Sequence, residues 1–139
     1  FKITSRNAIV KRIDETSAKA NQGMYERLKF QRQVDVKEDT ITISDYFGEQ
    51  FFQKRGRLNW LVPENLECYF ENNKIMISVN SSPKLEMQFQ KECKIQIIES
   101  NDSELGPIFH SPKKYQKIPA RRIIVTPDTR ELKTIIKLF

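Results

Sequence analysis

The clearest pattern in the chain is a strict alternation of apolar and polar residues between positions 66 and 98. Four successive runs show this alternation, and polar turn segments such as Asn72-Asn73 separate the runs. A period of two places apolar side chains on one face of a strand and polar side chains on the other. The pattern therefore predicts an antiparallel β-meander over 66–98, with one face toward a core and one face toward water.

Shorter patterns on either side of the meander predict further strands. Runs of β-branched and aliphatic residues indicate strands at 8–13, 40–43, 58–62 and 121–125. Residues 14–33 have a mixed pattern, which fits either a helix or a loop followed by a short helix.

Two helical segments are also predicted. A helical turn is expected near 45–53 and a closing helix over 128–138, because residues that cap helix N-termini stand at the start of each. The apolar residues of the second segment fall at helical spacing: Leu132, Ile135, Ile136 and Phe139. The expected fold is therefore α+β and β-rich, a bent antiparallel sheet or small barrel closed by a C-terminal helix.

The composition fits one intracellular domain, nuclear or cytoplasmic. The 139 residues are 38% hydrophobic and 30% charged, which suits a single domain over 1–139. No apolar run approaches the ~20 residues that span a bilayer, and no signal-peptide pattern is present. Because the first residue is Phe1 and not Met, we expect a domain excised from a longer protein. Cys68 and Cys93 occupy apolar strand positions and are expected as small buried residues in a reducing compartment, although paired strands would allow a disulfide.

Residues suited to catalysis are scarce. His110 is the only histidine and has no nucleophile placed to form a triad, and the four glycines form no phosphate-binding loop. No ligand spacing indicates a metal site. We therefore expect a non-catalytic domain without metal or cofactor. A Mg²⁺-dependent nuclease built from scattered acidic residues is the enzyme alternative that the sequence leaves open.

Basic residues gather in two clusters, and the formal net charge is +6. The first cluster consists of Lys54, Arg55 and Arg57. The second consists of Lys113, Lys114, Lys117, Arg121 and Arg122. Such clusters favour polyanions, and the alternative is an ordinary solvated surface.

Aromatic residues interleave with the first basic cluster. They are Tyr46, Phe47, Phe51, Phe52 and Trp60. Aromatic faces stack nucleobases and basic groups hold phosphates, so this composition is typical of a surface for single-stranded nucleic acid; an aromatic core is the alternative. We expect bases to stack on Tyr46, Phe51 and Trp60. The residues expected to contact phosphates are Lys54, Arg55, Arg57, Lys113, Lys114, Arg121 and Arg122.

A short motif lies inside the second cluster. Ser111-Pro112-Lys113-Lys114 fits a site for a proline-directed kinase, and a phosphate on Ser111 would lower the local positive charge. The motif also resembles the short basic turns that lie in the minor groove of A·T-rich DNA. An ordinary loop is the third interpretation.

Several features of residues 7–70 stand in a particular order. A strand at Ile9-Val10-Lys11-Arg12-Ile13 is followed by a second strand that ends in Tyr46-Phe47, then by Phe51, and finally by Leu61-Val62-Pro63-Glu64 ahead of Cys68. This order resembles part of a PAZ domain, the module of Argonaute and Dicer proteins that holds RNA 3′ ends. The resemblance implies that Tyr46 and Phe51 contact the terminal nucleotide and its phosphate. It does not extend to the meander.

Two functions are expected from these observations. The first is a nucleic-acid-binding module, for RNA or DNA, within a larger protein. The alternative is a protein-interaction module in a chromosome- or cytoskeleton-associated assembly, because a β-barrel closed by a C-terminal helix resembles pleckstrin-homology-like modules. The polar face of the meander is acidic, so a nucleic acid is expected on the flanks, around 46–60 and 113–122.

Overall fold

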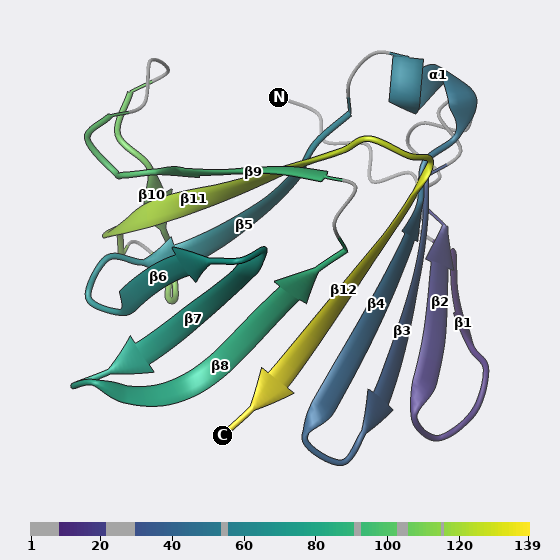
Figure 1. Cartoon of the computed structure of the whole chain (residues 1–139), viewed down its shortest axis with the longest axis horizontal. Helices are drawn as coiled ribbons and strands as arrows, with labels where there is room; N and C mark the ends of the chain where they lie inside the picture. Colours follow the sequence, from purple (N-terminus) through teal and green to yellow (C-terminus); the bar gives the residue numbers. More distant parts are fainter. Residues whose placement is uncertain (1–8, 22–29, 54–55, 91–92, 103–105, 115) are drawn as a thin grey trace.

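The computed structural model describes residues 9–21, 30–53, 56–90, 93–102, 106–114 and 116–139. Within these ranges the chain forms two antiparallel sheets and one short helix, α1 (Glu49–Gln53) (Figure 1). The large sheet contains, in spatial order, β1 (Ile9–Arg12), β2 (Ser17–Asn21), β3 (Gln31–Lys37), β4 (Thr40–Tyr46), β12 (Glu131–Leu138), β8 (Ser82–Phe89), β7 (Lys74–Val79) and β6 (Glu67–Glu71). The small sheet is built on β11 (Ile118–Pro127). Three strands pair with it: β10 (Phe109–His110), β5 (Leu58–Pro63) and β9 (Cys93–Ile98).

The two sheets enclose one hydrophobic core. The small sheet runs across one end of the large sheet, and the turn at 128–130 carries the chain from β11 into β12 (Figure 1). Both sheets contribute fully buried side chains, including Ile75 and Leu132 from the large sheet and Ile123 and Val125 from the small one. The alternate residues of the same strands face outward, so each sheet also presents an outer face.

An ion pair inside the protein ties the two sheets together. Arg32 and Asp45 are register partners on β3 and β4, and the guanidinium binds the carboxylate through two hydrogen bonds, of 2.6 and 3.0 Å. The guanidinium carbon also lies 5.8 Å from the ring centre of Phe30 and 5.5 Å from that of Trp60, which belongs to the small sheet. Asp45 is 2% exposed. A buried carboxylate is stable only when it is paired in this way.

The predicted C-terminal helix is wrong, and with it the α+β assignment. Residues 131–138 form strand β12, which lies between β4 and β8. Leu132, Thr134 and Ile136 are buried and alternate with outward-facing residues, so the operative period is two. Because the inward-facing Thr134 is polar, the apolar residues of this segment do not by themselves show a period of two.

Other predicted elements also shift. The segment 45–53 divides between the end of β4 and the short helix α1. Residues 17–21 and 31–37 are strands, where a helix or a loop with a short helix was expected. The fold is therefore almost entirely β.

The predicted meander is confirmed for three of its four strands. β6, β7 and β8 are joined by tight turns in which Asn72, Asn73, Asn80 and Ser81 have positive φ angles between 49° and 62°. β9 leaves this sheet and pairs with β11 in the small sheet. Alternation correctly predicts that Cys93, Ile95 and Ile97 face the core, and it carries no information about which strand lies alongside.

Candidate functional site

The outer face of the small sheet carries three basic side chains. Arg57 immediately precedes β5, Lys94 lies on β9 opposite Thr126, and Arg122 lies on β11 between Ile98 and Leu61. Each is adjacent in sequence to a residue that faces the core, so the pleat directs all three outward. Within the described part of the chain, none of the three has an ion pair or a side-chain hydrogen bond.

A cleft of about 640 Å³ opens at one end of this face. Arg57 and Lys94 line it, and both side chains are exposed. The other lining residues are Phe52, Gln53, Gly56, Gln96, Thr126, Pro127 and Asp128. The cleft therefore combines two cations with one carboxylate, several uncharged hydrogen-bonding groups and one aromatic ring.

A second depression, of about 420 Å³, lies on the outer face of the large sheet. Register places Lys19, Gln33, Ser44 and Lys133 side by side across four adjacent strands. The two lysines are separated by three strand spacings, which amounts to about 14 Å. We call this depression the lysine groove. Its remaining lining residues are Gln31, Asp45, Tyr46, Gln90, Glu131 and Leu132.

Tyr46 lies in the lysine groove and is held by Arg130. The Arg130 guanidinium carbon is 5.1 Å from the centre of the tyrosine ring, and its Nη2 donates a hydrogen bond to the tyrosine hydroxyl. Arg130 Nε also donates to the backbone oxygen of Phe47, at 3.3 Å. The ring remains 37% exposed. Tyr46 is therefore an aromatic side chain with restricted motion and an accessible surface.

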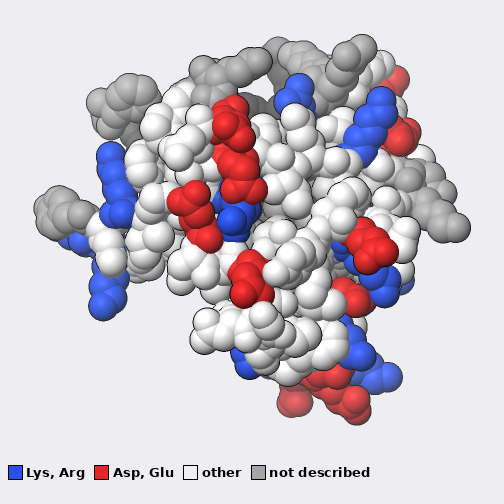
Figure 2. All heavy atoms as spheres, turned by 60° about the vertical axis from the view of Figure 1, so that its left-hand side comes forward, with Lys and Arg blue, Asp and Glu red and all other residues white. Residues whose placement is uncertain are grey.

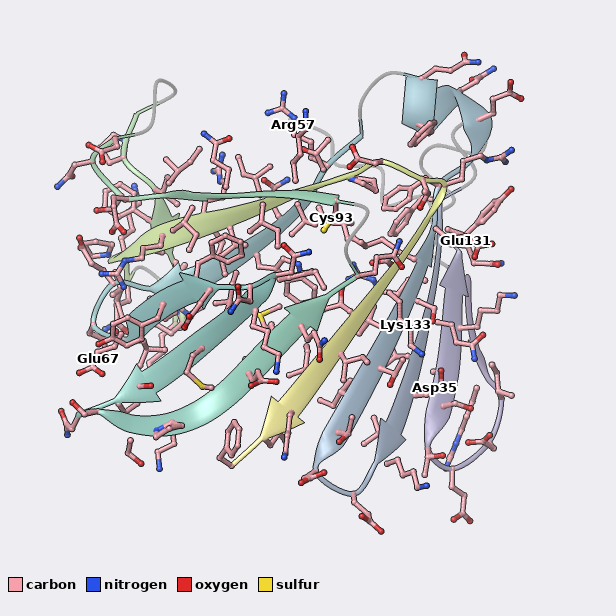
Figure 3. The ribbon with its side chains drawn as sticks, viewed as in Figure 1. Asp35, Arg57, Glu67, Cys93, Glu131 and Lys133 are labelled. Carbon is pink, nitrogen blue, oxygen red and sulfur yellow. The ribbon has the colours of Figure 1, made fainter. Side chains whose placement is uncertain are left out.

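The cleft and the lysine groove lie on either side of one corner of the molecule. Pro127 and Asp128 line the cleft, and Glu131 and Lys133 follow in the same chain segment and line the groove. In Figure 3, Arg57 lies above the small sheet, whereas Glu131 and Lys133 lie along β12 beyond the corner.

Arg121, a predicted phosphate contact, is engaged in the fold. Its Nε donates to both carboxylate oxygens of Glu99, at 3.0 and 2.7 Å, and its Nη1 donates to the backbone oxygen of Leu66, at 2.5 Å. Only 19% of its side chain is exposed. On the face that Figure 2 shows, acidic and basic side chains intermix, and the described residues form no continuous basic surface there.

The remaining predicted residues lie apart from the cleft or outside the described ranges. Lys113 and Lys114 follow β10, which pairs with β11 near Pro119, about 26 Å along the strand from Pro127. Trp60 is half-buried and packs toward the core, and its Nε1 is buried without a hydrogen-bond partner in the described part. Lys54, Arg55 and the side chain of Phe51 lie outside the described residues.

Sequence reasoning did not identify Lys19, Lys94, Arg130 or Lys133. Each stands outside the two basic clusters, and only the pairing of distant strands brings it to the cleft or the groove. For Lys94, alternation with Cys93 and Ile95, which face the core, indicated that the side chain faces outward.

Other kinds of site receive no support from the described residues. They contain no group of three or more His, Cys, Asp or Glu residues arranged to hold a metal ion. Cys68 and Cys93 form no disulfide; the buried Cys93 thiol donates to the backbone oxygen of Gln90, at 3.1 Å, and burial raises the pKa of the Cys68 thiol. No helix in these ranges is long and apolar enough to cross a bilayer. Neither the protein-family models nor the curated proteins compared with this chain match it.

Proposed function

We propose that this chain is a non-catalytic module that binds single-stranded nucleic acid around the corner formed by the turn at 128–130. The observation that carries the proposal is a set of cations on the outer face of the small sheet that have no acidic partner among the described residues; two of them line a cleft. Phosphates contact Arg57, Lys94 and Arg122. The strand then crosses the corner into the lysine groove.

Charge supports this assignment. An exposed cation that already has a carboxylate within 4 Å gains less from a phosphate. Arg121 is paired with Glu99, so it is excluded from the proposed binding surface. Arg57, Lys94 and Arg122 meet no such carboxylate in the described part of the chain. Asp128 lines the cleft and lowers its net charge without cancelling it.

The lysine groove supplies what a nucleobase requires. A base gains about 1–3 kcal/mol by stacking on an aromatic side chain, and this gain is largest when the ring is already ordered. Arg130 orders the Tyr46 ring and leaves part of it accessible. Lys19 and Lys133 flank the groove at a separation that lets a backbone pass between them. Tyr46 is thus the proposed stacking residue.

Salt dependence tests the phosphate contacts. Each phosphate contact on a single strand contributes about −0.7 to the slope of log affinity against log salt concentration. Binding of a fluorescein-labelled 12-nucleotide RNA or DNA is followed by anisotropy at 50–300 mM KCl. The double variant Arg57→Gln/Lys94→Gln is expected to bind more weakly, with a slope smaller in magnitude by about 1.4.

A matched variant separates local contacts from net charge. Lys37→Gln/Lys84→Gln removes the same charge at the end of β3 and on β8, at two exposed positions that line neither depression. It is expected to bind nearly as well as the unmodified protein. Absence of saturable binding at 50 mM KCl, or equal losses in both double variants, would contradict the proposal.

An abasic strand tests the stacking residue. Tyr46→Leu is expected to weaken binding of the normal 12-mer by about 5- to 150-fold, because one stacking interaction is lost. It is expected to leave binding of an abasic 12-mer unchanged, because that strand has phosphates and no bases. Equal weakening for both strands would indicate structural damage and would remove Tyr46 from the site. Tyr46→Phe, which keeps the ring, serves as the control.

A further inference from the structure

Strand β6 forms one edge of the large sheet and exposes apolar side chains there. In the described part of the chain its only strand neighbour is β7. Tyr69 is 59% exposed and Phe70 is 46% exposed. Exposed edges of this kind present unpaired backbone groups and commonly accept a further strand.

The turn geometry identifies which backbone groups are unpaired. Asn72 and Asn73 form a two-residue turn, so Glu71 and Lys74 make a hydrogen-bonded pair, and the N–H and C=O groups of Tyr69 also point toward β7. The N–H and C=O groups of Cys68 and Phe70 therefore point away from the sheet. Leu66 lies two residues before Cys68, so its backbone oxygen also points to the open edge, where it accepts the hydrogen bond from Arg121.

Arg121 closes one end of this edge. Its guanidinium occupies the Leu66 oxygen and pairs with Glu99, so an added strand extends only from Cys68 toward the β6–β7 turn. The available edge is short, and affinity must also come from side chains. The side chains of the partner must therefore complement those of β6.

Charge on the edge selects the partner. Glu67 and Glu71 bracket Tyr69 on one face of β6, and Figure 3 places Glu67 on the side of the molecule away from Lys133. If two copies of this chain paired symmetrically through β6, centred on Tyr69, Glu67 of one copy would lie opposite Glu71 of the other. Like charges placed directly opposite destabilise a strand pair, so the edge disfavours its own copy. Lysine or arginine at both positions of an added strand gives two favourable pairs instead.

We propose that β6 is a docking edge for an extended basic segment of a partner protein, which adds antiparallel to the large sheet. The segment carries Lys or Arg at two positions four residues apart, opposite Glu67 and Glu71, and an apolar residue midway between them, opposite Tyr69. Its backbone pairs with Cys68 and Phe70. This site is independent of the nucleic-acid surface proposed above.

The proposal is tested with a synthetic peptide, acetyl-Thr-Lys-Thr-Val-Thr-Lys-Thr-amide, added to ¹⁵N-labelled full chain. The expected result is saturable shifts of the Cys68, Tyr69 and Phe70 amides, with slowed hydrogen exchange at Cys68 and Phe70. A second peptide with Glu in place of both Lys residues is expected to bind at least 5-fold more weakly. A third peptide with Pro in place of the third and fifth residues, which lie opposite Phe70 and Cys68, is expected not to bind, because Pro has no N–H to donate to the β6 backbone.

Charge reversal on the protein completes the test. Glu71→Lys is expected to remove the preference between the Lys and Glu peptides, because each peptide then makes one favourable and one unfavourable pair, and Glu67→Gln is expected to weaken the Lys peptide about 2- to 5-fold. Glu71 is exposed, whereas Glu67 is half-buried and its carboxylate accepts hydrogen bonds from the backbone N–H of Ser81, at 3.3 and 3.1 Å. The amide oxygen of glutamine can accept the same hydrogen bond, so neither variant is expected to disturb the core. Equal binding of the Lys and Glu peptides to the unmodified chain, shifts outside β6, or a concentration-dependent dimer that Glu71→Lys leaves intact would overturn the proposal.

Discussion

Replacing Arg32 by alanine leaves the carboxylate of Asp45 inside the protein without its bidentate partner. The Asp45 side chain is 0% exposed, whereas the Arg32 side chain is 32% exposed. Removing one member of a buried ion pair costs about 3–5 kcal/mol, because the other charge stays desolvated. Arg32 is partly exposed and water can enter after its removal, so we expect the lower end, about 3 kcal/mol.

The reciprocal substitution is expected to cost less. Asp45→Ala leaves a guanidinium that still reaches water and still packs against Phe30 and Trp60. We expect a loss of about 2 kcal/mol, close to that of a charged hydrogen bond. The double variant is expected to lose about 1–2 kcal/mol less than the sum of the single variants, because both remove one interaction.

Urea unfolding measures these values. Trp60 is the only tryptophan and packs beside the pair, so its fluorescence reports the transition, with far-ultraviolet circular dichroism as a second probe. By thermal denaturation, Arg32→Ala is expected to lower Tm by about 10 °C for a domain of this size. Lys74→Ala breaks the exposed pair with Glu86 and is expected to cost under about 0.5 kcal/mol. A loss below about 0.5 kcal/mol in Arg32→Ala, or a larger loss in Asp45→Ala, would refute the reasoning.

Three further predictions concern other titratable or charged groups. The backbone N–H of Thr16 donates to the carboxylate of Asp14 and holds its pKa below 3.8, so this contribution to stability is present above pH 3.8 and is lost as pH falls through the lower folded-state pKa. Urea unfolding of Asp14→Ala should therefore differ from the unmodified protein at pH 7 and converge with it at strongly acidic pH; a constant difference would contradict this. Arg121→Ala is expected to lower stability by about 2 kcal/mol and to leave the salt slope of oligonucleotide binding unchanged; a reduced slope would restore it to the binding surface. Because burial raises the pKa of Cys68, its alkylation in a Cys93→Ala variant should be slower at pH 8 than that of free cysteine, and an equal rate would count against that burial.

The C-terminal segment illustrates what local pattern leaves undetermined. Leu132, Ile135, Ile136 and Phe139 satisfy helical spacing, yet Leu132, Thr134 and Ile136 are the residues that the protein buries. The β-branched run Thr134-Ile135-Ile136 was the available signal for a strand. Pairing with strands that are distant in sequence makes this segment a strand, because Ile136 lies between Ile41 of β4 and Met87 of β8.

The candidate site follows the same logic. Arg57 and Arg122 belong to different sequence clusters, and the pairing of β5 with β11 places both on one outer face. Arg121 is adjacent to Arg122, but the pleat turns it to the other face, where Glu99 and the backbone of Leu66 engage it. Charge clusters in the sequence therefore indicated the composition of the surface, whereas strand pairing determined which cations have no acidic partner within the described ranges.

Amide chemical-shift mapping with a 12-nucleotide single strand tests the central claim most directly. The ¹⁵N-labelled chain is titrated at 50 mM KCl with RNA and, separately, with DNA of the same sequence. The predicted result is saturable shifts at Arg57, Lys94 and Thr126 in the cleft and at Tyr46 and Lys133 in the lysine groove, with β6 and β7 unchanged. Shifts confined to the segment around Lys113 and Lys114, or no saturable shifts at all, would contradict the account.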